Sequence, residues 1–127
     1  LVRALLEREE QSGIPSDRLV VAGFSQGAAV ALFTGVRFPR RLAGILALSG
    51  YEVLPEARYE ATPENASTPI FFGHGTYDPL VPVARGRAAH AAYAQGREAL
   101  WREYPIEHSV SMDEIEEVGE WLRNRLP

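Results

Sequence analysis

Cysteine and lysine are both absent from this sequence, and each absence excludes a class of chemistry. The 127-residue chain has no cysteine, so it forms no disulfide, no thiolate metal site and no thiol nucleophile. Its thirteen basic residues are all arginine, which excludes Schiff-base chemistry, a serine–lysine dyad and a P-loop lysine. No apolar run approaches the ~18 residues that a membrane span needs.

Positive charge is also scarce relative to negative charge. The formal net charge is −4 at pH 7, which gives no electrostatic attraction for nucleic acid or for an anionic membrane surface. A composition of 46% hydrophobic and 24% charged residues is typical of one compact domain with a real core. The first residues mix apolar and charged positions, unlike a secretory signal, and we therefore expect a cytoplasmic protein.

Helix-like and strand-like apolar patterns alternate along the chain. Strands are predicted where short apolar or alternating runs occur, at Arg18–Phe24, Leu42–Ser49, Pro69–Gly75 and Leu100–Tyr104. Helices are predicted where apolar or small residues dominate at helical spacing, from Leu1 to Gly13, at Ser25–Phe38, at Val83–Gly96 and from Ser111 onward. This alternation predicts an α/β fold, a mostly parallel sheet of about four strands with helices on both faces, as one partial domain over residues 1–127.

The last helix has a clear start signal. Ser111 and Glu114 have the spacing of a capping box, in which the serine accepts from the backbone at Glu114 and the glutamate reaches back. Apolar residues then recur on one predicted face, at Ile115, Val118, Trp121 and Leu122.

The strand at Arg18–Phe24 has too few neighbours for its composition. It is apolar almost throughout, as interior strands are. As the first strand of this sequence it has one obvious neighbour, which leaves a hydrophobic edge of the kind that proteins avoid. The chain also begins with leucine and not methionine. We therefore expect that further strands precede residue 1 in a longer protein, or that another chain covers this edge.

The sharpest signal lies between the first strand and the following helix. It is the run Gly23-Phe24-Ser25-Gln26-Gly27. A serine on such a tight strand-to-helix turn is a nucleophile elbow, where side chains two positions to either side must be very small. The backbone N–H of Gln26, at the start of the helix, then points to where an oxyanion would form. The alternative is that Ser25 simply caps the helix.

Three histidines are available as a base for the serine. His108 follows the last strand, where a side chain reaches the carboxyl edge of the sheet, and it is the candidate. His74 is interpreted as part of a turn, and His90 as a surface or packed residue in a helix. No pair of them has the spacing of a metal site, so no metal is expected.

The imidazole needs a carboxylate to orient it, and Asp78 is the candidate. Pro79 favours an extended backbone at Asp78, which fixes the direction of its side chain. An ordinary Asp-Pro turn is the alternative, and Glu107 is badly placed to reach the ring of its own neighbour. The chain order Ser25, Asp78, His108 is the order of α/β-hydrolases.

Four motifs together carry a family resemblance: Gly23 to Ala28, Ala47 to Tyr51, His74 to Pro82 and Tyr104 to Val110. In them the sequence resembles the small α/β-hydrolases of the carboxylesterase, acyl-protein thioesterase and lysophospholipase family, over essentially the whole chain. The resemblance implies Ser25 as nucleophile, Asp78 as acid and His108 as base. The family's earlier half, with a His-Gly loop that supplies the second oxyanion donor, has no match here. The chain is therefore similar to the carboxyl-terminal half to two-thirds of an α/β-hydrolase fold.

These observations predict a serine hydrolase that cleaves carboxylic esters or thioesters through an acyl-enzyme, without a cofactor. The expected substrate is a small-molecule or lipid-type ester, with peptides or cyclic lactones as alternatives, and neither nucleic acid nor stable membrane insertion is expected. Substrate-binding residues are not identified, although the long loop Tyr51–Thr68 is a candidate acyl-pocket wall or lid. The rival hypothesis is a catalytically incomplete hydrolase fragment that acts as a non-catalytic or oligomerising module, for example a homodimer.

Overall fold

Four parallel strands form the centre of the molecule. The computed structural model describes residues 1–54 and 60–127. The strands lie side by side in chain order, as β1 (Val20–Phe24), β2 (Gly44–Leu48), β3 (Ile70–Gly75) and β4 (Ala99–Tyr104). Each neighbouring pair is parallel, so all four carboxyl ends meet at one edge of the sheet. The predicted four-stranded parallel sheet is confirmed.

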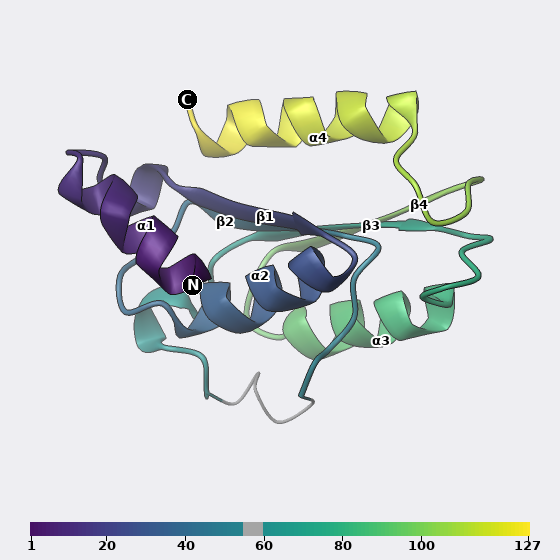
Figure 1. The fold of residues 1–127 in the computed structure, drawn as a ribbon, viewed down its shortest axis with the longest axis horizontal. Helices are drawn as coiled ribbons and strands as arrows, with labels where there is room; N and C mark the ends of the chain where they lie inside the picture. The colour runs from purple at the N-terminus through teal and green to yellow at the C-terminus, as the bar shows by residue number, and fades with distance from the viewer. Residues whose placement is uncertain (55–59) are drawn as a thin grey trace.

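Helices cover both faces of this sheet (Figure 1). On one face lie α2 (Gln26–Arg37) and α3 (Val83–Tyr93), and on the other lies α4 (Met112–Arg125). The first helix, α1 (Val2–Gln11), contacts α2. The α/β fold class with helices on both faces is therefore confirmed. No helix within the two described ranges is both long and apolar enough to cross a lipid bilayer.

Successive residues of the central strands pack into two separate hydrophobic clusters. Ile45 and Ala47 of β2 belong to the cluster under α2, whereas Leu46 packs with Phe71 and Trp121 on the side of α4. Neighbouring side chains of a strand point to opposite faces of a sheet. A central strand covered by helices on both faces must therefore be apolar at every position, which explains the continuous apolar runs in the sequence.

The last helix differs from its prediction at two points. Ser111 does cap α4, since its Oγ accepts from the N–H of Glu114 at 3.1 Å. The other half of the capping box is not formed, because neither carboxylate oxygen of Glu114 has a hydrogen-bond partner among the described residues. Glu114 is fully buried and Ile115 is 52% exposed, so the predicted apolar face is wrong at its first position.

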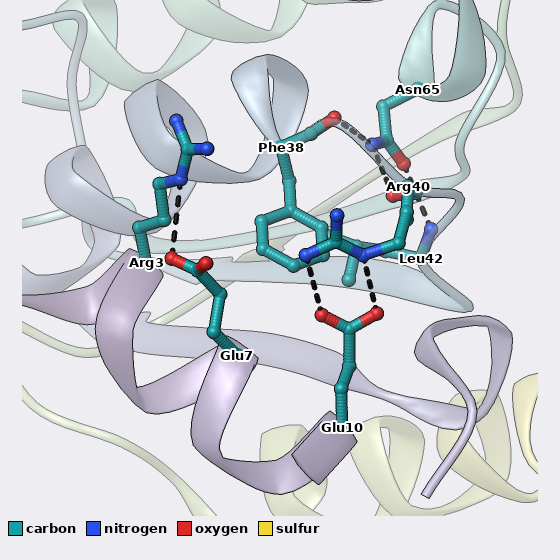
Figure 2. A network of polar contacts seen from close by, with 7 residues as sticks. All are labelled: Arg3, Glu7, Glu10, Phe38, Arg40, Leu42 and Asn65. Atoms are coloured by element: carbon teal, nitrogen blue, oxygen red, sulfur yellow. Dashed lines mark hydrogen bonds and ion pairs between the residues drawn. The ribbon is translucent and has the colours of Figure 1, made fainter.

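The amino-terminal edge of the sheet is held by polar contacts between distant segments (Figure 2). Asn65 is fully buried, and its amide donates to the carbonyls of Phe38 and Arg40, each at 2.8 Å. Its Oδ1 accepts from the N–H of Leu42 at 2.9 Å. Arg40 in turn forms a bidentate ion pair with Glu10 of α1, at 2.6 and 2.7 Å. These contacts tie α1 to the segment that leads into β2.

The predicted loop Tyr51–Thr68 begins near the carboxyl ends of the strands and ends near their amino ends. Its middle part, residues 55–59, lies outside the described residues. Its second half contains a short 3-10 turn, η3 (Pro63–Asn65), and the N–H of Thr62 donates to Val36 at 2.8 Å. This half lies at the amino ends of the strands, away from the carboxyl edge (Figure 1). A role as pocket wall or lid therefore applies only to the beginning of the segment.

The first strand lies at the edge of the sheet. A short 3-10 turn, η1 (Ser16–Arg18), leads into β1, which pairs only with β2 within the described ranges. Ala22 and Phe24 of β1 are exposed. The single neighbour that the sequence predicts for this strand is what the structure shows.

Candidate active site

Ser25 lies on a turn that leaves no spare residue between β1 and α2. Its N–H donates to the carbonyl of Leu48 at 2.8 Å and continues the pairing of β1 with β2. Its own carbonyl already accepts from Ala28 and Ala29, at 3.0 and 3.1 Å, and begins α2. Ser25 joins the strand and the helix with backbone angles of φ 59° and ψ −119°. This left-handed conformation is unfavourable in energy for any residue other than glycine. Its side chain makes no capping bond to the helix, so the alternative of a simple helix cap does not hold.

The two glycines that flank this turn have different roles. A Cβ added at Gly23 would overlap the backbone of Gly27 and Ala28, so only glycine fits there. A Cβ added at Gly27 would meet no atom within 4 Å outside its own helix turn. The prediction that both positions must be glycine is thus wrong for Gly27, because the close approach involves its backbone and not its side-chain position.

The structure brings the three predicted side chains together at the carboxyl edge of the sheet. Nε2 of His108 lies 2.9 Å from Oγ of Ser25, and Nδ1 lies 2.6 Å from Oδ2 of Asp78. A carboxylate can only accept, so Nδ1 of His108 carries the proton and Nε2 is left to accept from the serine hydroxyl. The side chain of Asp78 is fully buried and that of His108 is 15% exposed. The hydroxyl, the imidazole and the carboxylate thus form one continuous hydrogen-bonded row.

Backbone contacts hold the two loops that carry the imidazole and the carboxylate against each other. The N–H of Thr76 donates to Tyr104 at 2.9 Å, and the N–H of Tyr77 donates to Ile106 at 3.1 Å. These bonds extend the pairing of β3 with β4 beyond the ends of the strands. A Cβ at Gly75 would overlap the carbonyl of Glu107, so glycine permits this close approach.

The environment of Asp78 favours its charged form. Burial acts to raise the pKa of this carboxyl, but the hydrogen bond from His108 and the N–H groups of Val81 and Leu80 outweigh burial, so its pKa lies below the usual value. The two N–H groups donate to Oδ1, at 2.8 and 2.9 Å. Oδ2 is therefore free to accept from His108, and the carboxylate is ionised at neutral pH.

Comparison with known protein families matches residues 1–126 to the family described as Phospholipase/Carboxylesterase. The chain belongs to this family. Acyl-protein thioesterase 1 of Neurospora crassa is 39% identical over 128 residues, which cover 97% of this chain and 52% of that protein. Acyl-protein thioesterase 1 of Saccharomyces cerevisiae is 35% identical over 130 residues, covering 98% and 57%. The chain thus spans about half the length of these curated relatives.

A solved structure gives the same fold. The crystal structure of SOBER1 from Arabidopsis thaliana superposes with a TM-score of 0.92 at 29% identity, and covers 99% of this chain and 61% of that one. The resemblance to small α/β-hydrolases inferred from four motifs is therefore confirmed at the level of family and fold.

The other two histidines of this phospholipase/carboxylesterase family member lie away from the serine. His74 lies within β3 and is 1% exposed, and its Nε2 contacts the carbonyl of Val81 at 2.7 Å. His90 is half-buried in α3, with Nε2 at 2.8 Å from the carbonyl of Ala99, and it is packed as predicted. In the part of the chain that the structure describes, no group of three or more His, Asp or Glu side chains is placed to hold a metal ion.

Two site residues were missed by sequence reasoning. Phe24 is 40% exposed, and its ring lies 4.8 Å from the ring of His108, centroid to centroid. It occupies the variable position before the serine, so its motif gives no signal for this contact. The interpretation of His74 as part of a turn is wrong, since it lies within β3. Its contact with the carbonyl of Val81 follows from tertiary packing alone.

Gln26 is the first residue of α2 and is exposed. N–H groups in the first turn of a helix have no partner within the helix. Gln26 also lines an open groove of about 530 Å³ that runs between α1, α2 and the free edge of β1, with Ala22, Gly27 and Val30.

Proposed function

We propose that this chain carries the nucleophile, base and acid of a serine hydrolase that cleaves carboxylic esters or thioesters. The observation that carries the proposal is the position of His108, whose two ring nitrogens contact Ser25 and Asp78 at 2.9 and 2.6 Å. Membership of the phospholipase/carboxylesterase family supports the reaction class. The names of the thioesterase relatives support a thioester as one substrate.

The reaction follows from the proton positions. Oγ of Ser25 attacks the acyl carbon while its proton moves to Nε2 of His108, and the ionised Asp78 stabilises the imidazolium. The bond from the acyl carbon to oxygen or sulfur then breaks, and His108 gives the proton to the leaving alkoxide or thiolate. Water repeats the sequence on the acyl-enzyme, releases the carboxylic acid and restores the serine. These steps require protein side chains and water alone.

The tetrahedral intermediate needs hydrogen-bond donors, and we assign one of them to the N–H of Gln26. It lies at the positive end of α2, directly after the nucleophile. The sequence of residues 1–127 contains no match to the His-Gly loop that is expected to supply a second donor. Loss of one such donor costs on the order of 10²–10³ in rate. We therefore propose that the full rate requires a segment outside these residues.

We propose a small-molecule or lipid-type ester or thioester as the substrate class. The beginning of the Tyr51–Thr68 segment follows β2 at the same edge as Ser25, and we keep it as the candidate acyl-pocket wall. Shortening it should change the preferred acyl-chain length, and an unchanged preference would remove it from the pocket.

Hydrolysis of two matched substrates tests this function. We expect release of the same acyl group from an oxygen ester and from a thioester, with complete loss in Ser25→Ala and a loss on the order of 10⁴ in Asp78→Asn. A Ser25→Ala variant that hydrolyses the substrates at the wild-type rate would contradict the proposal.

A further inference from the structure

The segment that carries Asp78 rests on the imidazole of His74. This side chain is 1% exposed in the middle layer of the molecule, and its Nε2 lies 2.7 Å from the carbonyl oxygen of Val81. A carbonyl oxygen only accepts, so Nε2 of His74 carries a proton and donates it. The buried ring is therefore held as a donor at this nitrogen.

Val81 passes this constraint to the carboxylate. Its own N–H donates to Oδ1 of Asp78 at 2.8 Å, beside the N–H of Leu80 at 2.9 Å. Fixing the carbonyl of Val81 fixes the turn of backbone that wraps around the carboxylate. A continuous chain of hydrogen bonds thus leads from His74 through Val81 and Asp78 to His108.

The ring of His74 has no freedom to turn away. It stacks on Trp101 of β4, with 6.1 Å between ring centroids and 24° between the planes. It also lies against Gly86 of α3, where an added Cβ would overlap Nδ1. Its Nε2 is 3.7 Å from Oδ2 of Asp78, too far for a hydrogen bond. The bond to Val81 keeps this N–H off the oxygen that His108 uses.

We propose that His74 is a positioning residue: its Nε2–H holds the carbonyl of Val81 and thereby aims Oδ2 of Asp78 at Nδ1 of His108. The inference rests on the proposed function, since it concerns the acid of the same site. A role in packing alone would need only the shape of the ring. The positioning role needs a donor at the Nε2 position.

Two substitutions of His74 separate these roles. His74→Gln keeps an N–H donor near the position of Nε2, and His74→Leu keeps apolar volume without a donor. We expect the rate of Ser25 labelling by a fluorophosphonate to fall ~10²-fold in His74→Leu, the scale of a misplacement near 1 Å, and to be roughly tenfold higher in His74→Gln than in His74→Leu. Measurable labelling at equal rates in the two variants, or faster labelling with leucine, would overturn the proposal.

A substitution on α3 perturbs the ring of His74 without changing His74 itself. Gly86→Ala places a methyl group against Nδ1 of His74, whereas Gly119→Ala in α4 meets only Arg123, at 3.5 Å. Both changes replace a helical glycine by alanine, so their effect on helix propensity is matched. We expect slower labelling in Gly86→Ala and the wild-type rate in Gly119→Ala. Wild-type labelling in Gly86→Ala would contradict the proposal.

An NMR measurement keeps this inference separate from the proposed function. The proton on Nδ1 of His108, in its 2.6 Å bond to Asp78, should give a far-downfield resonance, assigned by its loss in His108→Gln. We expect this resonance in the wild type and in His74→Gln, and its loss or upfield shift in His74→Leu. If no variant is labelled but the resonance follows this order, the proposed function fails and the positioning role stands. An unchanged resonance in His74→Leu would overturn the positioning role.

Discussion

Ser25 keeps a left-handed backbone because its neighbours on both sides have no alternative position. The strand bond to Leu48 and the helix bonds from Ala28 and Ala29 fix both of its peptide units. The surrounding structure thus over-determines the turn, which is the condition under which such strain persists. This backbone conformation directs the hydroxyl of Ser25 toward His108 and away from the helix.

Replacing each flanking glycine by alanine tests which one the turn requires. Gly23→Ala forces a Cβ into the backbone of Gly27, and we expect a loss of unfolding free energy of about 1–3 kcal/mol, as for an overpacked core. Gly27→Ala adds a methyl group in open space at the start of a helix, and we expect no loss, or a gain of up to ~1 kcal/mol. Denaturant unfolding of both variants measures this difference. Equal destabilisation would refute the one-sided collision.

Single residues differed in how well the sequence predicted them. Ser25, Asp78 and His108 could be singled out because a tight turn, an Asp-Pro step and a small number of histidines each restrict the choice. Ser25 and Asp78 lie 83 and 30 residues from His108 along the chain, so only the folded structure shows that the three side chains contact each other. The error at Gly27 arose because the motif does not say which partner of a close contact contributes the Cβ. No sequence pattern marked His74, whose role depends on a carbonyl seven residues away.

At the scale of elements, the least expected feature is the buried carboxyl of Glu114 on α4. It packs against Gly73 of β3, where an added Cβ would overlap Oε2. Burial, with a smaller contribution from the negative charge of Glu117, raises the pKa of this carboxyl to about 7. Glu114 and Ile115 both have the helical spacing of a residue on the buried face of α4. A rule based on apolar spacing selects Ile115 because it is apolar, and only the packing in the fold shows that Glu114 is the buried one.

The pH dependence of stability should show this buried carboxyl. The pKa is raised on folding from 4.5, so ionisation of Glu114 adds no penalty below about pH 4.5, and this penalty grows as the pH rises to about 7. The full penalty above pH 7 is about 3 kcal/mol, at 1.36 kcal/mol per pKa unit. We expect Glu114→Gln to unfold at higher denaturant concentration than the wild type at pH 8, and at a similar concentration at pH 4.5.

The exposed Glu116 of the same helix supplies the control for that comparison. Glu116→Gln removes one negative charge without emptying a buried site, so we expect the same small effect at both pH values. If Glu114→Gln followed Glu116→Gln at pH 8, the carboxyl of Glu114 would not be the source of the penalty.

At the scale of the whole molecule, β1 lies at one edge of the sheet and pairs only with β2 among the described residues. Ser25 donates its N–H to Leu48 of β2. Since amides alternate direction along a strand, those of Ala22 and Phe24 point away from β2. The groove of about 530 Å³ lies along the same edge. The unpaired edge is the observation that favours the second candidate function, an oligomerising module. The sequence predicted the edge position of β1, because this strand is apolar almost throughout and has one neighbour.

Self-association through this edge can be tested with one outward-facing amide. If copies of the chain pair through β1, Ala22→Pro removes a donor from the edge while leaving the bonds to β2 in place, and it should shift the chain toward monomer. Ala22→Ser keeps the amide and should associate like the wild type. Sedimentation over a range of concentrations gives the answer, and identical behaviour of all three proteins would exclude pairing through β1.

The most direct measurement for the central claim is the covalent capture of one serine. The chain contains other serines, but within residues 1–54 and 60–127 only the hydroxyl of Ser25 has an imidazole nitrogen at 2.9 Å to accept its proton. After exposure to a fluorophosphonate, peptide mass spectrometry should find the adduct on Ser25, reduced in Asp78→Asn and absent in Ser25→Ala. An intact wild-type protein that gains no adduct, or gains it on another serine, would contradict the proposal that these three side chains form a working nucleophile.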